Sequence, residues 1–414
     1  MVNDIDKFKI LTFMSSREGT LLYEYMEDLI EALRELGQEV FVLDLYSKRE
    51  EIRNTREMAE VIYEAIYRFK PDFILTITYF GLVPKLFDRL KIPYAAWLTN
   101  DPMIPEIPIP PPSQYFHLFI HENGAIKEVR KMGYKNLYYL PLAVNPRRYR
   151  KIPQEDKVLD RYRCEVSFLG NAGPRWEENG YGGYEHLGGF LSQEKINRMI
   201  DQLRNNPIQP ILETFFEVKN GISPLDASRM AEELERLHPD KAFQIKEWLK
   251  PVKSESVKWY RRDIIKQIAD YREIHLYGDT AWRWLGKNSK AVYHGILGGR
   301  DRDAVVRVYN ASKINVCVQS NVYNTGLNYR TFTIPACGAF MISDYRKELI
   351  ELFEEDKEVV FFRKKEELPD MIDYYLAHPE RRERIALNAQ HRVLKEHTYT
   401  YRIKRILDVM KEVI

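Results

Sequence analysis

The sequence has few cysteines, no long apolar run and no apolar leader at its start. Its 414 residues include three cysteines, which are too few for a disulfide scaffold. Cys164, Cys317 and Cys337 lie in apolar strand or helix settings, so we interpret them as small core residues in a reducing compartment. No apolar run reaches the roughly 18 residues that a membrane-spanning helix needs, and the opening MVNDIDKFK contains no signal-peptide core. These absences predict a cytoplasmic protein without a transmembrane segment.

An excess of charge of either sign is also missing. Lysine and arginine number 63, aspartate and glutamate number 61, and the net charge is +2. A nucleic-acid-binding chain is expected to carry a clustered basic excess, so this balance argues against nucleic acid as a partner. The sequence contains no CxxC, HExxH, EF-hand, GxSxG or Walker motif, and we expect no bound metal.

The chain has the length and, at 44% hydrophobic residues, the apolar content for two domains. In its first half short apolar runs alternate with helical patterns, which predicts a parallel, Rossmann-like sheet. The expected strands are Phe8–Phe13, Val40–Leu43, Phe73–Thr78, Tyr94–Trp97, His117–His121 and Leu137–Leu140, and the expected helices are Thr20–Leu36, Thr55–Arg68, Val83–Leu90 and Gly124–Met132. The first loop, MSSREG, has one glycine where a dinucleotide fingerprint needs three, which argues against a bound dinucleotide.

Polar residues follow four of these strands, at the sheet edge where ligands gather: Ser15–Arg17, Thr78 with Tyr79, Thr99–Asp101, and His121 with Glu122. Asp101 comes after the strand Tyr94–Trp97, where its carboxylate is either a candidate proton acceptor or the start of a turn. His121 and Glu122 form a second candidate pair, with capping of the next helix as the alternative. Six prolines between residues 102 and 112 predict a stiff loop, which is either an acceptor-recognition loop or a spacer.

A proline-containing stretch, Pro141–Pro153, marks a domain boundary near residue 150. A second series of strands and helices opens at Cys164, and polar, helix-prone sequence interrupts it from about residue 176 to 257. This interruption includes Gln193–Asn205 and Ser228–Leu249 and has few large apolar positions per turn. We interpret it as a helical insertion that serves either as an acceptor-binding platform or as an oligomer contact.

The stretch Asn321–Asp344, NVYNTGLNYRTFTIPACGAFMISD, is the most distinctive part of the second half. Its pattern predicts three elements in order: a loop around Gly326, a helix from about Asn328 to Cys337, and a strand from Ala339 to Ile342. A helix N-terminus offers unpaired N–H groups and the positive end of a dipole, which suits an anion such as a diphosphate. Arg330 adds a planar fork of donors. On pattern alone, the same stretch also fits a helix that binds nothing.

Several motifs together resemble a known family. FLGN (Phe168–Asn171), LYG (Leu276–Gly278), YNASKINVCV (Tyr309–Val318), GLNYRTFTIPACGAFMISD and EHTYTYR (Glu396–Arg402) resemble the C-terminal half of the glycosyltransferase group that includes the spore-maturation protein CgeB. The resemblance implies an α/β chain of the GT-B fold, with two Rossmann-like domains facing a cleft and a helical insertion in the second. It implies an acceptor-side domain 1–150, a donor-side domain 151–395 and a C-terminal helix, 396–414, that packs back on the first domain.

For the donor side, the resemblance implies residues in loops after strands and in the distinctive stretch. They are Gly170, Asn171, Arg175, Tyr277, Gly278, His294, Thr325, Gly326, Leu327, Asn328, Arg330 and Thr333. Arg330 and Arg175 are expected to offset diphosphate charge, although Arg175 fits a surface charge equally well. Related sequences usually carry a glutamate where this chain has Thr333, and a threonine hydroxyl cannot supply that charged acceptor for ribose hydroxyls.

The resemblance implies a metal-independent transfer of a sugar from a nucleotide-sugar, expected to be a UDP-sugar, with no tightly bound cofactor. The acceptor is a protein, a glycan or another surface component, and Asp101 and His121 are the candidate catalytic residues. The alternative is a degenerate GT-B protein that acts as a surface or spore-coat-type interaction protein, which Thr333 and the insertion favour. A sugar-nucleotide epimerase or phosphorylase is a third hypothesis.

Overall fold

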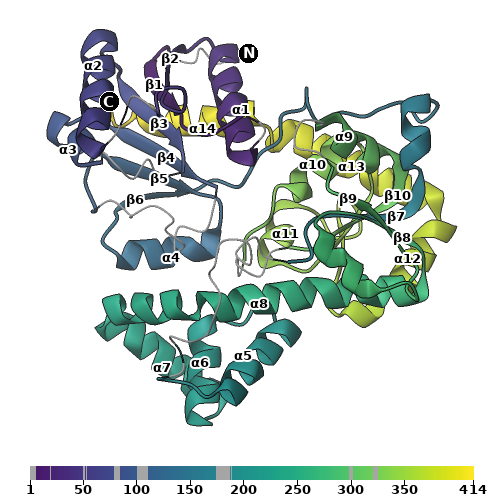
Figure 1. Cartoon of the computed structure of the whole chain (residues 1–414). Helices are drawn as coiled ribbons and strands as arrows, with labels where there is room; N and C mark the ends of the chain where they lie inside the picture. The colour runs from purple at the N-terminus through teal and green to yellow at the C-terminus, as the bar shows by residue number, and fades with distance from the viewer. Residues whose placement is uncertain are drawn as a thin grey trace. The chain divides into compact units, whose positions relative to one another are not determined.

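The computed structural model describes residues 6–18, 20–49, 52, 54–78, 84–99, 111–173, 187, 189–297, 302–319 and 325–414. The chain divides into two compact units. Unit 1 comprises Met1–Arg147 and Val393–Ile414, and unit 2 comprises Arg148–Arg392 (Figure 1). Unit 1 is therefore discontinuous in sequence, because the end of the chain returns to it.

Unit 1 contains a six-stranded parallel sheet in the order β2-β1-β3-β4-β5-β6. Its strands are β1 (Lys9–Met14), β2 (Glu39–Asp44), β3 (Phe73–Ile77), β4 (Tyr94–Leu98), β5 (Phe116–Ile120) and β6 (Asn136–Tyr139). Its helices are α1 (Leu21–Glu35), α2 (Thr55–Phe69), α3 (Pro84–Leu90), α4 (Asn123–Lys131) and α14 (Tyr399–Lys411). The expected alternation of strands and helices in this half is confirmed, and each bound agrees within two residues.

Local chemistry explains why the elements of unit 1 begin where they do. Side chains of Thr20 and Asn54 cap α1 and α2 by accepting hydrogen bonds from amides of the first helical turn. Every residue of β3, β4 and β5 is buried, as expected for central strands covered on both faces. The C-terminal helix α14 joins this core: Tyr399 packs edge-on against Trp97 at 5.4 Å between ring centroids.

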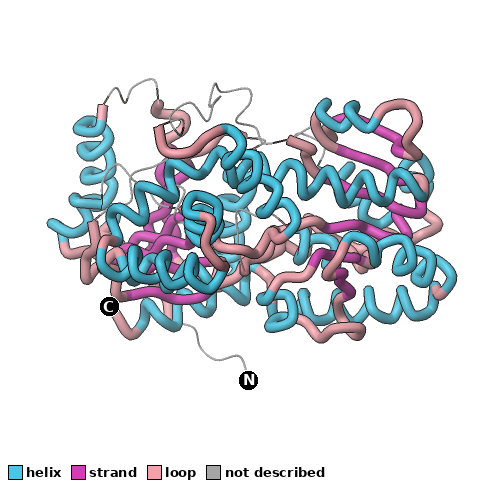
Figure 2. Tube along the Cα trace, turned by 90° about the horizontal axis from the view of Figure 1, so that it is seen from below, coloured by secondary structure: helices cyan, strands magenta, loops and turns pink. Residues whose placement is uncertain are grey.

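Unit 2 contains a second six-stranded parallel sheet, in the order β12-β11-β10-β7-β8-β9. Its strands are β7 (Cys164–Leu169), β8 (Ile274–Tyr277), β9 (Ala291–Gly295), β10 (Ser312–Cys317), β11 (Met341–Asp344) and β12 (Val360–Phe362). Its helices are η1 (Lys157–Tyr162), α5 (Gln193–Asn205), α6 (Ile211–Asn220), α7 (Pro224–Leu237), α8 (Pro239–Tyr271), η4 (Thr280–Leu285), α9 (Arg302–Ala311), α10 (Arg330–Ala336), α11 (Lys347–Leu352), η5 (Lys365–Glu367), α12 (Leu368–Ala377) and α13 (Pro379–Glu396), whose last turn belongs to unit 1. In Figure 2 helices flank the strands.

Several expectations for unit 2 differ from the structure. The helix expected at Asn328–Cys337 is α10, Arg330–Ala336, and it is followed by a left-handed turn at Gly338, φ +66°. The strand expected at Ala339–Ile342 is β11, Met341–Asp344, because its pairing with β10 begins at Met341, opposite Asn315. The single helical segment expected at 228–249 is two helices, α7 and α8, which meet at His238. Pro239 follows His238 and is the first residue of α8, a position where its missing N–H costs nothing.

The insertion between β7 and β8 has a hydrophobic core of its own, contrary to the expectation of few apolar positions. Side chains from α5, α6 and the first half of α8 form it, and these three helices pack against one another. Its buried members are Leu187, Leu191, Ile196, Met199, Ile200, Leu203, Ile211, Phe215, Val218, Leu249 and Val252. The second half of α8 instead packs on the sheet of unit 2 through Ile264, Ile265 and Ile268.

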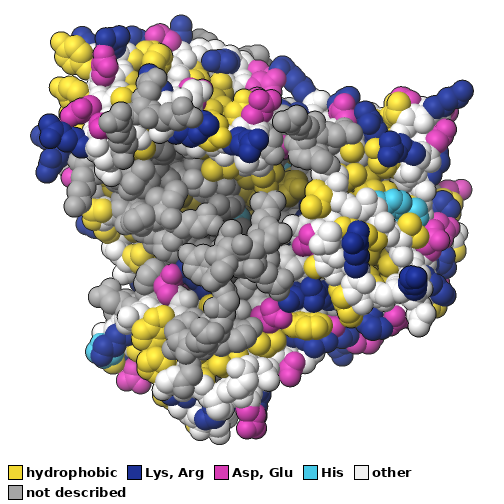
Figure 3. All heavy atoms as spheres, viewed as in Figure 1, with side chains coloured by type: hydrophobic (Ala, Val, Ile, Leu, Met, Phe, Trp, Pro, Cys, Tyr) yellow, Lys and Arg dark blue, Asp and Glu magenta, His cyan; other side chains and the backbone are white. Residues whose placement is uncertain are grey.

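The surface carries charges of both signs. Lysine, arginine, aspartate and glutamate side chains are interspersed on the face shown in Figure 3. Among the described residues, no helix combines the length and the apolar character needed to cross a membrane.

We predict that acidification destabilises the protein through His117. Burial on β5 lowers the pKa of His117 from its ordinary 6.5 to about 4, and its Nε2 is buried without a hydrogen-bond partner. Between these two values the unfolded chain binds a proton that the native chain does not, so the free energy of unfolding falls as pH falls, by up to about 1.4 kcal/mol per unit.

Denaturant titrations at pH 7 and pH 5 measure this dependence. The His117→Gln variant is expected to lose less stability than the parent between the two pH values, since glutamine does not titrate. An equal loss in both proteins would assign the pH dependence to other groups.

Candidate functional site

In unit 2, two glycines bring the ends of β7 and β8 together. Gly170 donates its N–H to the carbonyl of Tyr277 at 2.8 Å, and the Trp282 indole donates to the carbonyl of Gly170, also at 2.8 Å. A Cβ added to Gly278 would lie 2.1 Å from the Gly170 oxygen, so only glycine fits there. The backbone at Gly170 is therefore held in one place at the carboxyl edge of the sheet.

Two guanidinium groups meet at this fixed backbone. Arg261, on the second half of α8, donates from Nη1 to the Asn171 carbonyl at 2.7 Å. Arg330, the first residue of α10, places Nη2 where it would be 3.0 Å from a Cβ on Gly170. Residues distant in sequence thus bring two positive charges to the adjacent residues Gly170 and Asn171.

The charge environment of Arg261 is unusual. Burial, and then the nearby charge of Arg330, lower the pKa of Arg261 to about 10. Arg261 therefore remains protonated at neutral pH. The charges of Asp344 and Asp279 act in the opposite direction and raise the pKa of Arg261, although among the described residues neither carboxylate forms an ion pair with it. Its Nε is buried and makes no hydrogen bond. A partly buried cation with unused donors is a binding group for an anion.

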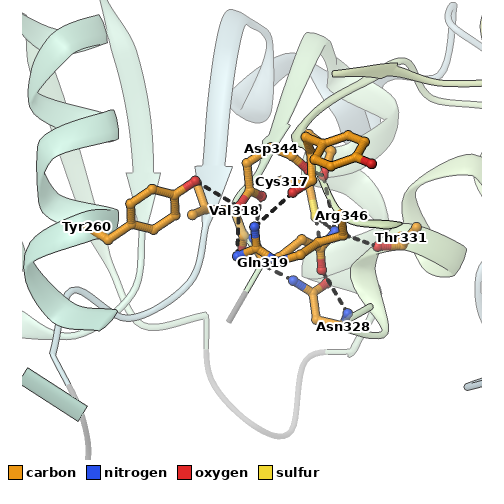
Figure 4. Close-up of polar contacts among 10 residues, drawn as sticks. Tyr260, Cys317, Val318, Gln319, Asn328, Thr331, Asp344 and Arg346 are labelled. Carbon is orange, nitrogen blue, oxygen red and sulfur yellow. Dashed lines mark hydrogen bonds and ion pairs between the residues drawn. The ribbon is translucent and has the colours of Figure 1, made fainter. Parts of the chain in front are cut away.

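The segment before Arg330 is fixed by hydrogen bonds. Asn328 accepts from the Arg330 N–H at 2.9 Å through Oδ1 and donates to the Val318 carbonyl at 3.1 Å through Nδ2. The N–H of Asn328 donates to Oε1 of the buried Gln319 at 2.8 Å. Figure 4 shows Asn328, Val318 and Gln319 together with Thr331, Asp344 and Arg346. The start of α10 therefore has a defined position relative to the end of β10.

Comparisons with known proteins agree with this architecture. Residues 260–408 match a family model described as glycosyl transferase-like. A stretch of 93 residues is 31% identical to spore protein CgeB of Bacillus subtilis (strain 168), and it covers 22% of this chain and 29% of CgeB. The match thus spans less than a third of the length of CgeB.

Solved structures resemble the whole chain. Anabaena HepE in complex with UDP-glucose has a TM-score of 0.55 at 10% identity, over 98% of this chain and 100% of HepE. A glycosyltransferase from Rickettsia africae ESF-5 has a TM-score of 0.53 at 12% identity, over 99% of both chains. Sucrose-phosphate synthase from Thermosynechococcus elongatus has a TM-score of 0.53 at 10% identity, over 98% of both.

The chain has the GT-B fold, and its segment 260–408 is similar to the glycosyl transferase-like family. The two parallel sheets are the two Rossmann-like domains that this fold requires, and both were expected from the sequence. The family match covers α8 from Tyr260 onward, the ends of β8 and β10, and α10. Both converging arginines therefore lie inside the matched segment.

The structure places the described donor-side residues of this GT-B protein in three groups, the third being Tyr277 with His294. The first group lies at the point where the Arg261 and Arg330 guanidinium groups approach Gly170 and Asn171, or fixes the backbone there. Its members are Gly170, Asn171, Gly278, Asn328 and Arg330. The second group lies nearby in sequence, but its side chains contact other residues or are buried. Its members are Thr325, whose hydroxyl donates to Glu348 at 2.8 Å; Gly326 and Leu327, which are buried; and Thr333, 2% exposed beside the hydroxyl of Tyr309.

Tyr277 and His294 contact each other instead of the two arginines. Their rings stack at 4.7 Å between centroids, and the Tyr277 side chain belongs to a buried cluster with Leu159 and Val308. Burial raises the pKa of Tyr277 to about 12. His294 Nε2 lies 3.0 Å from His275 Nδ1. The pKa of His294 is lowered, mainly by burial and secondly by the neighbouring charge of His275.

The expected catalytic residues belong to the other unit or lie outside the described residues. His121 follows β5, is 1% exposed, and has Nδ1 at 3.0 Å from the Leu98 carbonyl. Burial lowers the pKa of His121, which keeps its ring neutral. Glu122 stands at the N-cap position of α4, but its side chain makes no capping hydrogen bond. Asp101 and Arg175 lie outside the described residues.

Sequence reasoning missed Arg261. The insertion separates the motif FLGN from the motif LYG in the sequence. The YRR of α8 lies between them and resembles many other charged stretches of helical sequence. The available signal was position: α8 leads directly into β8, so its last turns had to cover the sheet. A helix that covers a parallel sheet and runs antiparallel to its strands has its earlier turns near the carboxyl ends of those strands.

We predict that Gly278→Ala displaces the Gly170 backbone and destabilises unit 2, because the new methyl group would overlap a carbonyl oxygen. The expected loss is about 2 kcal/mol or more of unfolding free energy. Gly189→Ala is the matched control, since a Cβ there meets nothing within 4 Å. Thermal and denaturant unfolding of both variants measure the effect, and equal stability of the two would contradict the packing argument.

Proposed function

We propose that this protein transfers a sugar from a nucleotide-sugar to an acceptor, with the donor diphosphate bound by Arg261 and Arg330. The observation that carries the proposal is the convergence of these two guanidinium groups on Gly170 and Asn171. A diphosphate is the ligand whose charge and forked geometry match two adjacent guanidinium groups. The glycosyl transferase-like family match supports the reaction class.

The same two residues suit the chemistry of sugar transfer. As the bond between the anomeric carbon and the diphosphate breaks, negative charge develops on the leaving phosphate. Fixed positive groups stabilise that developing charge more than they stabilise the ground state, because they need no reorganisation during the reaction. Two arginines can provide this stabilisation without a metal, so we propose that the reaction is metal-independent.

A UDP-sugar is the proposed donor. Anabaena HepE, whose structure contains UDP-glucose, supports this choice through its shared fold. The acceptor is proposed to interact with the N-terminal unit, with Asp101 or His121 as the group that takes the proton from its hydroxyl. Of these, His121 has the neutral ring that a base requires.

Thr333 favours a second candidate function, a GT-B protein that has lost catalysis and acts in surface assembly. The side chain is 2% exposed and provides a hydroxyl where related sequences usually have a carboxylate. If neither the parent protein nor Thr333→Glu binds any of UDP, GDP, ADP and dTDP, this second function is favoured. Binding of one nucleotide by the parent protein favours the transferase.

We predict that Arg261→Ala and Arg330→Ala each weaken UDP binding. Loss of charge-assisted hydrogen bonds costs about 2 kcal/mol, which corresponds to about a 30-fold rise in Kd. Isothermal titration calorimetry measures the Kd for UDP in each variant. Lys266→Ala is the control, because it removes one positive charge from the exposed face of the same helix. A Kd that rises equally in all three variants would mean that net charge, and not a defined site, attracts the nucleotide.

We also predict that excess EDTA leaves UDP affinity and sugar transfer unchanged, since arginines carry the charge of the diphosphate. UDP affinity and sugar transfer are each measured once in excess EDTA and once in excess magnesium chloride. Transfer that requires added magnesium would contradict the metal-independent mechanism.

A further inference from the structure

One buried carboxylate joins the two segments that carry the converging arginines. Asp344, the last residue of β11, is 1% exposed. Its Oδ2 accepts from the Tyr260 hydroxyl at 2.9 Å and pairs with Arg346 Nη2 at 3.0 Å, while its Oδ1 accepts from the Gln319 N–H at 2.7 Å. Figure 4 shows Tyr260 reaching from its helix toward this group.

The first connection fixes the direction of Arg261. Tyr260 precedes Arg261 in α8, its ring packs against the main hydrophobic cluster of unit 2, and its hydroxyl is held by Asp344. Burial, and then the Asp344 charge, raise the pKa of Tyr260 well above its ordinary value, so the hydroxyl stays protonated and donates. Successive side chains on a helix are separated by a fixed rotation, so anchoring Tyr260 sets where Arg261 points.

The second connection fixes the start of α10. Gln319 is 1% exposed, and besides its main-chain bond to Asp344 it uses its whole side-chain amide. Oε1 accepts from the Asn328 N–H at 2.8 Å, and Nε2 donates to Thr331 Oγ1 at 2.8 Å and to Ser343 Oγ at 3.1 Å. Asn328 in turn accepts from the Arg330 N–H, so the position of Arg330 depends on Gln319.

We propose that Tyr260 and Gln319, both anchored on Asp344, are positioning residues that set the spacing between Arg261 and Arg330 to fit two linked phosphates. The inference rests on the proposed function and adds to it the residues that make the site selective for a nucleoside diphosphate over a monophosphate. A monophosphate engages one guanidinium group, whereas a diphosphate spans both. An error in spacing therefore weakens diphosphate binding selectively.

The test compares UDP with UMP in Tyr260→Phe, which removes the hydroxyl and keeps the ring in the core. The Kd for UDP is expected to rise about tenfold, because Arg261 no longer lies at the spacing that two linked phosphates need, while the Kd for UMP stays unchanged within error. Tyr271→Phe is the matched control: it removes a hydroxyl that donates to the Asp373 carboxylate from the exposed end of the same helix. It is expected to leave both dissociation constants unchanged.

Each outcome separates the positioning role from the proposed function. If Tyr260→Phe keeps the parent ratio of UMP to UDP affinity while Arg261→Ala loses UDP, the positioning role is wrong and the diphosphate site stands. Equal weakening of both nucleotides indicates a merely structural role and overturns the inference. If the parent protein does not bind UDP or another nucleoside diphosphate, both proposals are wrong.

A second variant keeps the test available if Tyr260→Phe does not fold. Gln319→Met fills the same space and removes the amide that holds Asn328. It is expected to show the same selective loss of UDP affinity, through the position of Arg330. A parent-like ratio of UMP to UDP affinity in a folded Gln319→Met protein would overturn the inference.

Discussion

Electrostatic repulsion between Arg261 and Arg330 is the constraint around which the site of unit 2 is arranged. Like charges separate unless covalent geometry and hydrogen bonds hold them, and burial strengthens the repulsion by reducing solvent screening. The fold holds them from both sides. The Asn171 carbonyl accepts from one guanidinium, and Gln319 and Asn328 fix the backbone of the other. A ligand with two negative charges relieves this repulsion, which is the physical basis of the proposed diphosphate site.

The sequence predicted unit 1 well because its signals are local. Short apolar runs alternate with capped amphipathic helices, and Thr20 and Asn54 cap their helices in the usual way. Arg330 could also be selected from the sequence, since its loop–helix motif is contiguous. The converging partner could not, because Arg261 reaches the same backbone only through the packing of α8 on the sheet, which no local pattern contains.

The insertion shows a different limit of sequence reasoning. Each of its helices, taken alone, presents a narrow apolar stripe among many charged residues, and α6, Ile211–Asn220, was not expected at all. Together, three of these stripes close a core around Leu203, Phe215 and Leu249. Burial in this region is a property of the assembled helices, so periodicity within one helix underestimates it.

The return of the chain to unit 1 has a consequence for biosynthesis. Residues 6–147 leave the ribosome long before α14, whose apolar face includes the buried residues Ile403, Ile406, Leu407 and Met410. Until α14 is translated, the part of α1 that α14 covers stays open to solvent. A nascent N-terminal half therefore presents a ready chaperone-binding surface, and a premature stop far downstream leaves that half a substrate for proteolysis.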